Sequence, residues 1–489
     1  MSLYLMKQRA FVFNLALLIL LNLLIKPFWI LGIDVSVQNE VGVEQYGLYF
    51  AIFNFTFLFN MLLDMGITNF NNRNIAQHTH LLRKHLSGIL TLKLLLGVVY
   101  LAVALGVGIG IGYRGTRLYL LIWIAIGQFF NSLLLYLRSN ISALLLFKTD
   151  SFLSIFDKLL MLATCAFLLW GRVGHGPFKI EWFVYAQTGS YAIAALIALG
   201  IVSRKATLPV LHWNPPFVLV ILKKSIPFAL LYLLMSCYSR MDAVMIERLL
   251  PADEAGRETG IYASAFRLLD ALVMVAYLFS VILLPLFSKM LKNKEDIQPI
   301  LRTSFLLLFY FAMTASSLLI IYRQPLLQLL YRDHVQESAT VGMILFPCLL
   351  PLSLTYIFGT LLTANGNLKS LNIISLVAIV VNWTLNFLLI PHYYARGAAI
   401  SSLATQWGVL IAQVCCVYFL FARAKVKLPY MRVLLFSVVF LVATLLIRNY
   451  AGLTFEALSW SAGGSLMLAW FCGLLPLKNM WKETRVAIK

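Results

Sequence analysis

The chain has 489 residues, of which 61% are hydrophobic and only 12% are charged. A water-soluble protein of this length needs a much more polar surface, so the composition excludes a soluble globular fold. The formal net charge of +20 comes from Lys and Arg residues scattered over short segments, which excludes a nucleic-acid-binding stripe and favours anionic lipid headgroups as partners.

Apolar segments follow one another along nearly the whole chain, separated by loops too short to fold on their own. A helix needs about 20 residues to cross a hydrocarbon core of ~30 Å, and residues 11–32, 89–112, 344–364 and 433–447 illustrate segments that meet or approach this length. We therefore predict an all-α polytopic membrane protein with about 14 transmembrane helices.

The basic residues indicate how these helices are oriented. The loops on the side of the N-terminal tail hold about twice as many Lys and Arg residues as the loops on the other side, and Lys and Arg favour the cytoplasm. The predicted outer loop 34–44 has neither and carries Asp34, Glu40 and Glu44. We expect a multi-pass protein of the bacterial cytoplasmic (inner) membrane with both termini in the cytoplasm.

A short element recurs in the chain. Gly47-x-Tyr49 near the start of the second segment returns as Gly260-x-Tyr262 near the start of the eighth. Transporter folds are often built from repeated sets of helices. We predict a six-helix bundle at 1–205, a cytoplasmic connector at 206–217, a second six-helix bundle at 218–425, and two extra helices with a cytoplasmic tail at 426–489.

Several features stand in a distinctive order along the chain: a start that carries Lys and Arg, Val41-Gly42-x-Glu44-x-Tyr46-Gly47-x-Tyr49, Asp64-x-Gly66, Arg240-x-Asp242 and Gly260-x-Tyr262. This order resembles the polysaccharide transporter branch of the multidrug/oligosaccharidyl-lipid/polysaccharide (MOP) exporter superfamily, to which bacterial lipid-linked oligosaccharide flippases belong. The resemblance covers helices 1 to 12 through loose motifs. It implies a V-shaped pair of bundles around a central cavity that moves an undecaprenyl-diphosphate-linked sugar by alternating access.

Charged residues inside membrane segments are the candidate site. A charge at the bilayer centre costs ~3 kcal/mol on insertion scales, so such a residue usually faces a partner or a wet cavity. On the first segment Asn22 and Lys26 share a face at a spacing of four. Lys26 is the first candidate for substrate binding, and snorkelling to the outer headgroups is the alternative. Lys93, Lys158 and Arg267 also fall within or just inside predicted segments.

The second segment carries a polar stripe at spacings of four, in which Asn60 and Asp64 are candidate substrate-binding residues. The stripe lines a cavity or packs against another helix. Arg73 and Arg138 lie near the cytoplasmic mouth, where guanidinium groups suit a diphosphate, although ordinary positive-inside residues and an ion pair with Asp64 are the alternatives.

Asp157 and Lys158 are candidates for ion coupling in the fifth segment. As neighbours they lie ~100° apart around a helix, so we expect each to find a partner elsewhere. In the second half, Arg240 and Asp242 lie in the seventh segment. Arg267 and Asp270 lie three residues apart in the eighth segment, a spacing at which opposite charges can neutralise each other.

Together the resemblance and the intramembrane cations predict a flippase that carries undecaprenyl-diphosphate-linked oligosaccharide from the inner to the outer leaflet for cell-surface polysaccharide export, as in lipopolysaccharide O-antigen synthesis. Its partners would be that lipid, membrane lipids and other polysaccharide-assembly proteins. A cation-coupled multidrug antiporter and a membrane-embedded assembly enzyme are the alternatives. No Walker A, HExxH or GxSxG motif occurs, and no Cys or His cluster has metal-ligand spacing, so no enzyme, metal or cofactor is predicted.

Overall fold

The computed structural model describes residues 24–25, 28–68, 71, 75, 82–144, 146–171, 178–206, 215–421 and 429–474. Within these ranges every regular element is a helix and no strand occurs. Ten of the described helices are long and apolar enough to cross a membrane. The prediction of an all-α polytopic membrane protein is confirmed.

The remaining predicted crossings are formed by shorter, broken or merged helices. α16 (Leu368–Leu420) joins two crossings at a kink, where Pro391 lies in the helix and Tyr394 has φ 54°. α3 (Val43–Leu58) and α4 (Asn60–Asp64) form the second crossing. α18 (Phe455–Phe471) forms the last one. The first predicted crossing lies mostly outside the described residues. The crossings that the structure describes agree with the expected architecture of about 14.

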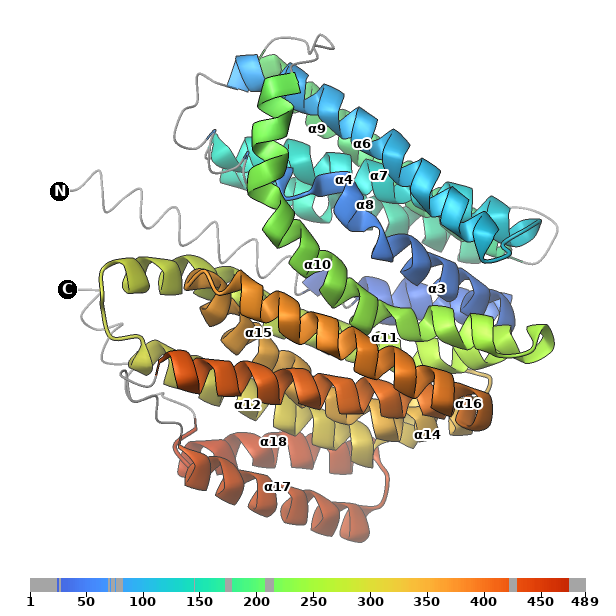
Figure 1. Ribbon diagram of the computed structural model, residues 1–489. Helices are drawn as coiled ribbons and strands as arrows, with labels where there is room; N and C mark the ends of the chain where they lie inside the picture. Colours follow the sequence, from blue (N-terminus) through green and yellow to red (C-terminus); the bar gives the residue numbers. More distant parts are fainter. Residues whose placement is uncertain are drawn as a thin grey trace. The chain divides into compact units, whose positions relative to one another are not determined.

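The chain divides by its contacts into two compact units, Met1–Ala263 and Ser264–Lys489. The first unit, blue to green in Figure 1, contains η1 (Trp29–Asp34), α2 (Val35–Val41), α3, α4, α6 (Leu82–Gly110), α7 (Thr116–Ala143), α8 (Phe147–Trp170), α9 (Ile180–Lys205), α10 (Pro215–Leu249) and the start of α11 (Ala252–Lys292). α7 packs on α3, α6, α8 and α9, and α10 packs along α3. The six-helix halves inferred from the repeat stay a prediction.

The segment 34–44, predicted as an outer loop, is mostly helical, so the loop prediction is wrong for most of these residues. Asp34 ends η1 with only 2% of its surface exposed, and α2 continues to Val41. Within this segment the helix is interrupted only at Gly42, whose φ of 84° favours glycine. The buried valines of α2 explain the difference, because they keep this segment packed inside the bundle.

The second unit contains the rest of α11, α12 (Gln298–Ile321), α13 (Arg323–Leu330), α14 (Val335–Leu345), η3 (Phe346–Cys348), α15 (Leu349–Ala364), α16, α17 (Tyr430–Ala451) and α18. α15 packs on α12 and α16, whereas α17 and α18 pack on each other and on α12. The buried face of α18 has small residues at spacings of four, Ala457, Ser461, Ser465 and Ala469. Small side chains let membrane helices approach closely.

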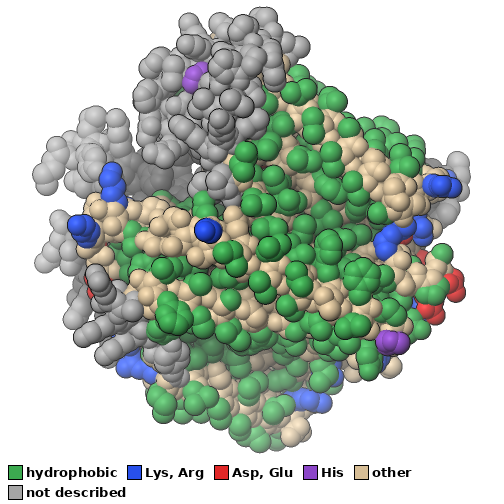
Figure 2. Space-filling model, viewed as in Figure 1, with side chains coloured by type: hydrophobic (Ala, Val, Ile, Leu, Met, Phe, Trp, Pro, Cys, Tyr) green, Lys and Arg blue, Asp and Glu red, His purple; other side chains and the backbone are tan. Residues whose placement is uncertain are grey.

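The protein surface is apolar where a membrane would contact it. Figure 2 shows hydrophobic side chains over most of the drawn face, with most charged side chains toward its left and right edges. Phe167 on α8, for example, is 61% exposed. Such exposure is favourable in hydrocarbon, so the surface agrees with a multi-pass membrane protein.

Candidate transport site

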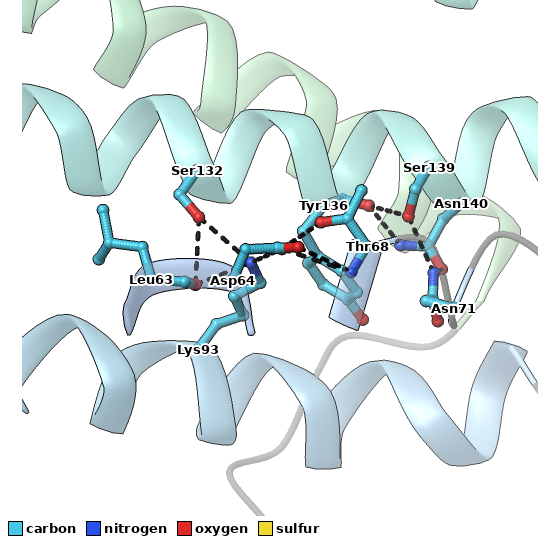
Figure 3. Close-up of polar contacts among 9 residues, drawn as sticks. All are labelled: Leu63, Asp64, Thr68, Asn71, Lys93, Ser132, Tyr136, Ser139 and Asn140. Atoms are coloured by element: carbon cyan, nitrogen blue, oxygen red, sulfur yellow. Dashed lines mark hydrogen bonds and ion pairs between the residues drawn. The ribbon is translucent and has the colours of Figure 1, made fainter. Parts of the chain in front are cut away.

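The most deeply buried lysine of the described chain lies against the end of α4. After Asp64 the backbone reverses through Met65 and Gly66, which have φ of 45° and 78°. This turn places the Asp64 carboxylate where both the ammonium of Lys93 on α6 and the Thr68 hydroxyl donate to it (Figure 3). The Lys93 side chain is 2% exposed and that of Asp64 is 32% exposed.

The Lys93 ammonium has three further contacts. It donates to the Leu63 carbonyl at 2.9 Å and to the Ser132 hydroxyl at 3.1 Å, and it lies 5.9 Å from the ring centroid of Tyr136. A cation beside the last carbonyls of a helix is favoured by the helix dipole. Lys93 therefore joins α4, α6 and α7. It pairs with Asp64, for which the sequence offered an ion pair with Arg73 or Arg138 as one alternative.

Arg138 has a different partner. Its Nε lies 2.9 Å from Oδ1 of Asp150, which links α7 to α8. Asn60 donates to the Gln128 side chain at 3.1 Å, so this member of the polar stripe faces α7. Arg73 lies outside the described residues, as do Asn22 and Lys26, so their predicted contact with a substrate stays a prediction.

Asp157 and Lys158 contact each other at 3.2 Å, so the expectation that these neighbours cannot pair is wrong. The long lysine side chain bends back to the carboxylate and also donates to the Tyr191 hydroxyl at 2.9 Å. Its ammonium lies 4.7 Å from the Tyr191 ring centroid and 5.9 Å from that of Trp29. This cluster joins η1, α8 and α9.

The candidate residues of the second predicted bundle fall in both units. In the first unit, the Arg240 guanidinium lies over the Phe57 ring at 5.4 Å, and the buried Asp242 accepts a hydrogen bond from the Tyr262 hydroxyl at 3.0 Å. In the second unit, Arg267 is buried on α11 and Asp270 is half-buried. Neutralisation of Arg267 by Asp270 stays a prediction.

A cluster that the sequence analysis missed surrounds the buried Glu247 near the end of α10. Its carboxylate accepts hydrogen bonds from Arg248 Nε at 2.5 Å and from the Tyr113 hydroxyl at 3.4 Å, and it pairs with Arg117 Nε at 3.3 Å. Arg248 also donates to the Ile111 carbonyl at 2.7 Å and lies over the Tyr113 ring at 4.4 Å. We call Tyr113, Arg117, Glu247 and Arg248 the Glu247 cluster.

The Glu247 cluster ties α10 to the turn between α6 and α7. Burial and the nearby Glu247 carboxylate raise the pKa of the Tyr113 hydroxyl above its ordinary value, which keeps it a hydrogen-bond donor at neutral pH. The sequence signal was weak, because Glu247-Arg248 and Arg117 stand near predicted helix ends, where charged residues are ordinary.

The two copies of the repeated Gly-x-Tyr element touch each other. A Cβ added at Gly47 of α3 would overlap the carbonyl oxygen of Gly256, and one added at Gly260 of α11 would overlap the Val43 carbonyl oxygen. The glycines thus permit backbone contact between the two helices. Gln38 on α2 reinforces the crossing by donating to the Gly260 carbonyl at 3.4 Å.

Three ion pairs of the described residues join helices of the first unit: Asp64–Lys93, Arg117–Glu247 and Arg138–Asp150. In the part of the chain that the structure describes, no group of three or more His, Cys, Asp or Glu residues could hold a metal ion. The arrangement offers binding and positioning groups inside a membrane protein, among them Arg240, a half-buried cation that lies over an aromatic ring.

Comparison with protein families identifies the chain. The sequence model described as "Polysaccharide biosynthesis protein" matches residues 11–291, more than half of the length. The chain belongs to this family. A second model, MatE, matches residues 227–388 of this polysaccharide biosynthesis protein family member. No match is found among proteins of curated function.

Solved structures share the fold of this family member. A lipid II flippase, MurJ, in an inward closed conformation has a TM-score of 0.68 and 12% identity, with 94% of this chain and 97% of that chain covered. An inward-facing multidrug resistance MATE transporter of the MOP superfamily has a TM-score of 0.63 and 15% identity, with 83% and 94% covered.

A MOP superfamily transporter from Pyrococcus furiosus has a TM-score of 0.53 and 14% identity to this chain, with 84% of this chain and 93% of that chain covered. The three likenesses concern the fold alone, because the identities are low. They show that this polysaccharide biosynthesis protein family member has the fold of a lipid II flippase and of MOP superfamily transporters.

Proposed function

We propose that the protein flips undecaprenyl-diphosphate-linked oligosaccharide from the inner to the outer leaflet of the bacterial cytoplasmic membrane, for lipopolysaccharide O-antigen or a related surface polysaccharide. The observation that carries the proposal is the polysaccharide biosynthesis family match over residues 11–291. The similar fold of a protein named lipid II flippase supports a lipid-linked substrate. The proposed role is transport without chemical change of the substrate.

The charges of the site suit an anionic lipid headgroup. A diphosphate must cross a region of low dielectric constant, where a fixed cation lowers its electrostatic cost. Arg240 supplies such a cation beside an aromatic ring, and we assign the same role to Lys26 and Arg267. In this scheme the protein shields the glycan while the polyprenyl tail stays in lipid.

Other predicted site residues have supporting roles in this proposal. Arg73 and Arg138 attract the diphosphate at the cytoplasmic mouth. Because Arg138 is paired with Asp150, its electrostatic attraction for the diphosphate is weaker. Asp157 and Lys158 are the ion-coupling candidates of the first bundle. With both termini in the cytoplasm, the substrate enters from the side on which polysaccharide units are assembled, where other assembly proteins would supply it.

A cation-coupled multidrug antiporter is the second candidate, because the MatE model matches residues 227–388 and MATE transporters share the fold. Such a transporter needs an acidic site for its cationic cargo. The carboxylates of Asp64, Asp150 and Glu247 are each engaged by a lysine or an arginine. These three carboxylates therefore do not form the uncompensated acidic site that a cationic cargo needs.

Transport by the purified protein in vesicles tests the choice. Vesicles would contain an undecaprenyl-diphosphate oligosaccharide in the membrane and, in parallel samples, an organic cation in the lumen. We expect protein-dependent exposure of the glycan to an added modifying enzyme and no proton-driven loss of the cation. Loss of the cation without movement of the glycan would assign the protein to the drug antiporters instead.

A further inference from the structure

Aromatic rings line one side of α3 and continue onto α10 within the first unit. The ring centroids of Tyr49 and Phe53 lie 5.9 Å apart, those of Phe53 and Phe57 6.2 Å apart, and those of Phe57 and Tyr232 6.5 Å apart. The Arg240 guanidinium stands over the Phe57 ring at 5.4 Å. We call Phe53, Phe57, Tyr232 and Arg240 the aromatic track.

The aromatic track is partly exposed. Tyr232 is 46% exposed, and Phe53, Phe57 and Arg240 are half-buried. Ser239, the neighbour of Arg240, is also half-buried. An arginine on a face turned to hydrocarbon would cost ~3 kcal/mol, so a half-buried arginine in mid-helix favours a wet surface over a lipid-facing one.

The spacing of the track matches the head of a lipid-linked glycan. Arg240 and Tyr232 lie eight residues apart on α10, which corresponds to ~12 Å along the helix axis. This length is comparable to that of two linked sugar units. Both residues contact the same ring, Phe57, so the track is one continuous surface across α3 and α10.

The chemistry of the track matches two parts of that ligand. A guanidinium group binds phosphate oxygens through paired N–H donors. Flat aromatic faces suit the C–H-rich face of a sugar ring, and a tyrosine hydroxyl adds a hydrogen bond at the edge. Aromatic side chains lose little conformational freedom when a ligand binds, so they favour recognition of varied hydroxyl-rich partners.

We infer that Arg240 binds the diphosphate while Phe57 and Tyr232 stack on the adjoining sugars of the transported glycan. This inference rests on the proposed flippase function and adds the residues that recognise sugar. A polyprenyl tail is the other apolar occupant of an aromatic surface, but the arginine within the track opposes it, since a cation gains nothing from a hydrocarbon chain.

Binding of two related lipids to the purified full-length protein shows whether the track contacts the sugars or the polyprenyl tail. One is undecaprenyl diphosphate without sugar, and the other carries an oligosaccharide on the same diphosphate. Affinity is read from thermal stabilisation in detergent. We expect the wild type to bind the glycosylated lipid more tightly, because the diphosphate and the sugars then both contact the track.

Two substitutions remove the rings, Phe57→Leu and Tyr232→Leu. Each should weaken binding of the glycosylated lipid by about threefold to tenfold and leave binding of the sugar-free lipid unchanged. Tyr232→Phe keeps the stacking face and should retain most of the affinity. Arg240→Gln should weaken the binding of both lipids. Phe167→Leu, on the exposed face of α8, is the matched control and should change neither.

Three other outcomes would contradict the inference, each for a different reason. If both leucine variants bind the glycosylated lipid as the wild type does, the rings do not recognise sugar. If the leucine variants bind both lipids equally more weakly, the rings contact the polyprenyl tail and not the sugars. If the wild type binds neither lipid, the proposed function fails and the inference fails with it. The surface position of Tyr232 keeps the test valid should Phe57→Leu not fold.

Discussion

Lys93 on α6 contacts residues of both α4 and α7, so it joins three helices of the first unit. Its ammonium touches Asp64, the Leu63 carbonyl and Ser132. Removing one member of a buried ion pair costs more than the pair contributes, because the other charge stays behind without its partner. Asp64 is partly exposed, which limits that cost.

We predict that Lys93→Met lowers the unfolding free energy of the protein by about 3 kcal/mol, measured as thermal unfolding in detergent. The double variant Lys93→Met with Asp64→Asn should recover part of the loss, because no isolated carboxylate remains. Lys148→Met, at an exposed lysine on α8, is the control and should change little. A Lys93→Met protein as stable as the wild type would contradict a structural role for the pair.

The sequence indicated which charged side chains need a partner, but it did not indicate which partner each one has. Asp64 and Lys158 were singled out because charges in apolar segments need partners. Which partner each finds depends on helix packing: Asp64 meets Lys93 where α4 packs on α6. Helical spacing alone also missed the contact of Lys158 with Asp157, since it ignores the reach of a long side chain.

At the scale of elements, the crossing of α3 and α11 depends on two glycines. We predict that Gly47→Ala destabilises the protein by ~1–3 kcal/mol, because the added methyl group would overlap the Gly256 carbonyl and force the helices apart. Gly106→Ala on α6 is the matched control, since open space surrounds that position. Equal thermal unfolding of the two variants would show that the crossing is not tight.

The Glu247 cluster holds the end of α10 against the turn between α6 and α7. We predict that Glu247→Gln speeds amide hydrogen exchange about tenfold at residues 110–116 and at the end of α10, because two arginines lose their counter-charge. Asp253→Asn, at an exposed acid nearby, should leave exchange unchanged. Unchanged exchange in Glu247→Gln would mean that packing alone holds the turn.

The elements themselves were largely predictable. Long apolar stretches fix where helices such as α6, α7 and α12 run, since a membrane demands continuous backbone hydrogen bonding. The break at the end of α4 was not predictable, because the left-handed backbone of Met65 is a local feature that no sequence pattern indicates. The Gly-x-Tyr repeat indicated two related elements but not their mutual contact.

For the whole molecule, the distribution of basic residues predicts a defined orientation in the membrane. In a cysteine-free background, Arg114→Cys in the turn before α7 should react with a membrane-impermeant thiol reagent added outside the cell. Asn293→Cys in the turn before α12 should react only after the membrane is opened. Both positions are exposed. The reverse pattern would contradict the orientation inferred from the basic residues.

In the proposed function, a cationic site inside the membrane protein serves to move a lipid-linked sugar. The rate at which the glycan appears on the far side of a vesicle membrane tests this directly. We predict rapid, protein-dependent translocation by the wild type and a loss of at least about tenfold in both Arg240→Ala and Lys26→Ala, each still inserted in the membrane. Full translocation by both variants would contradict the cationic site, and no translocation by the wild type would contradict the function itself.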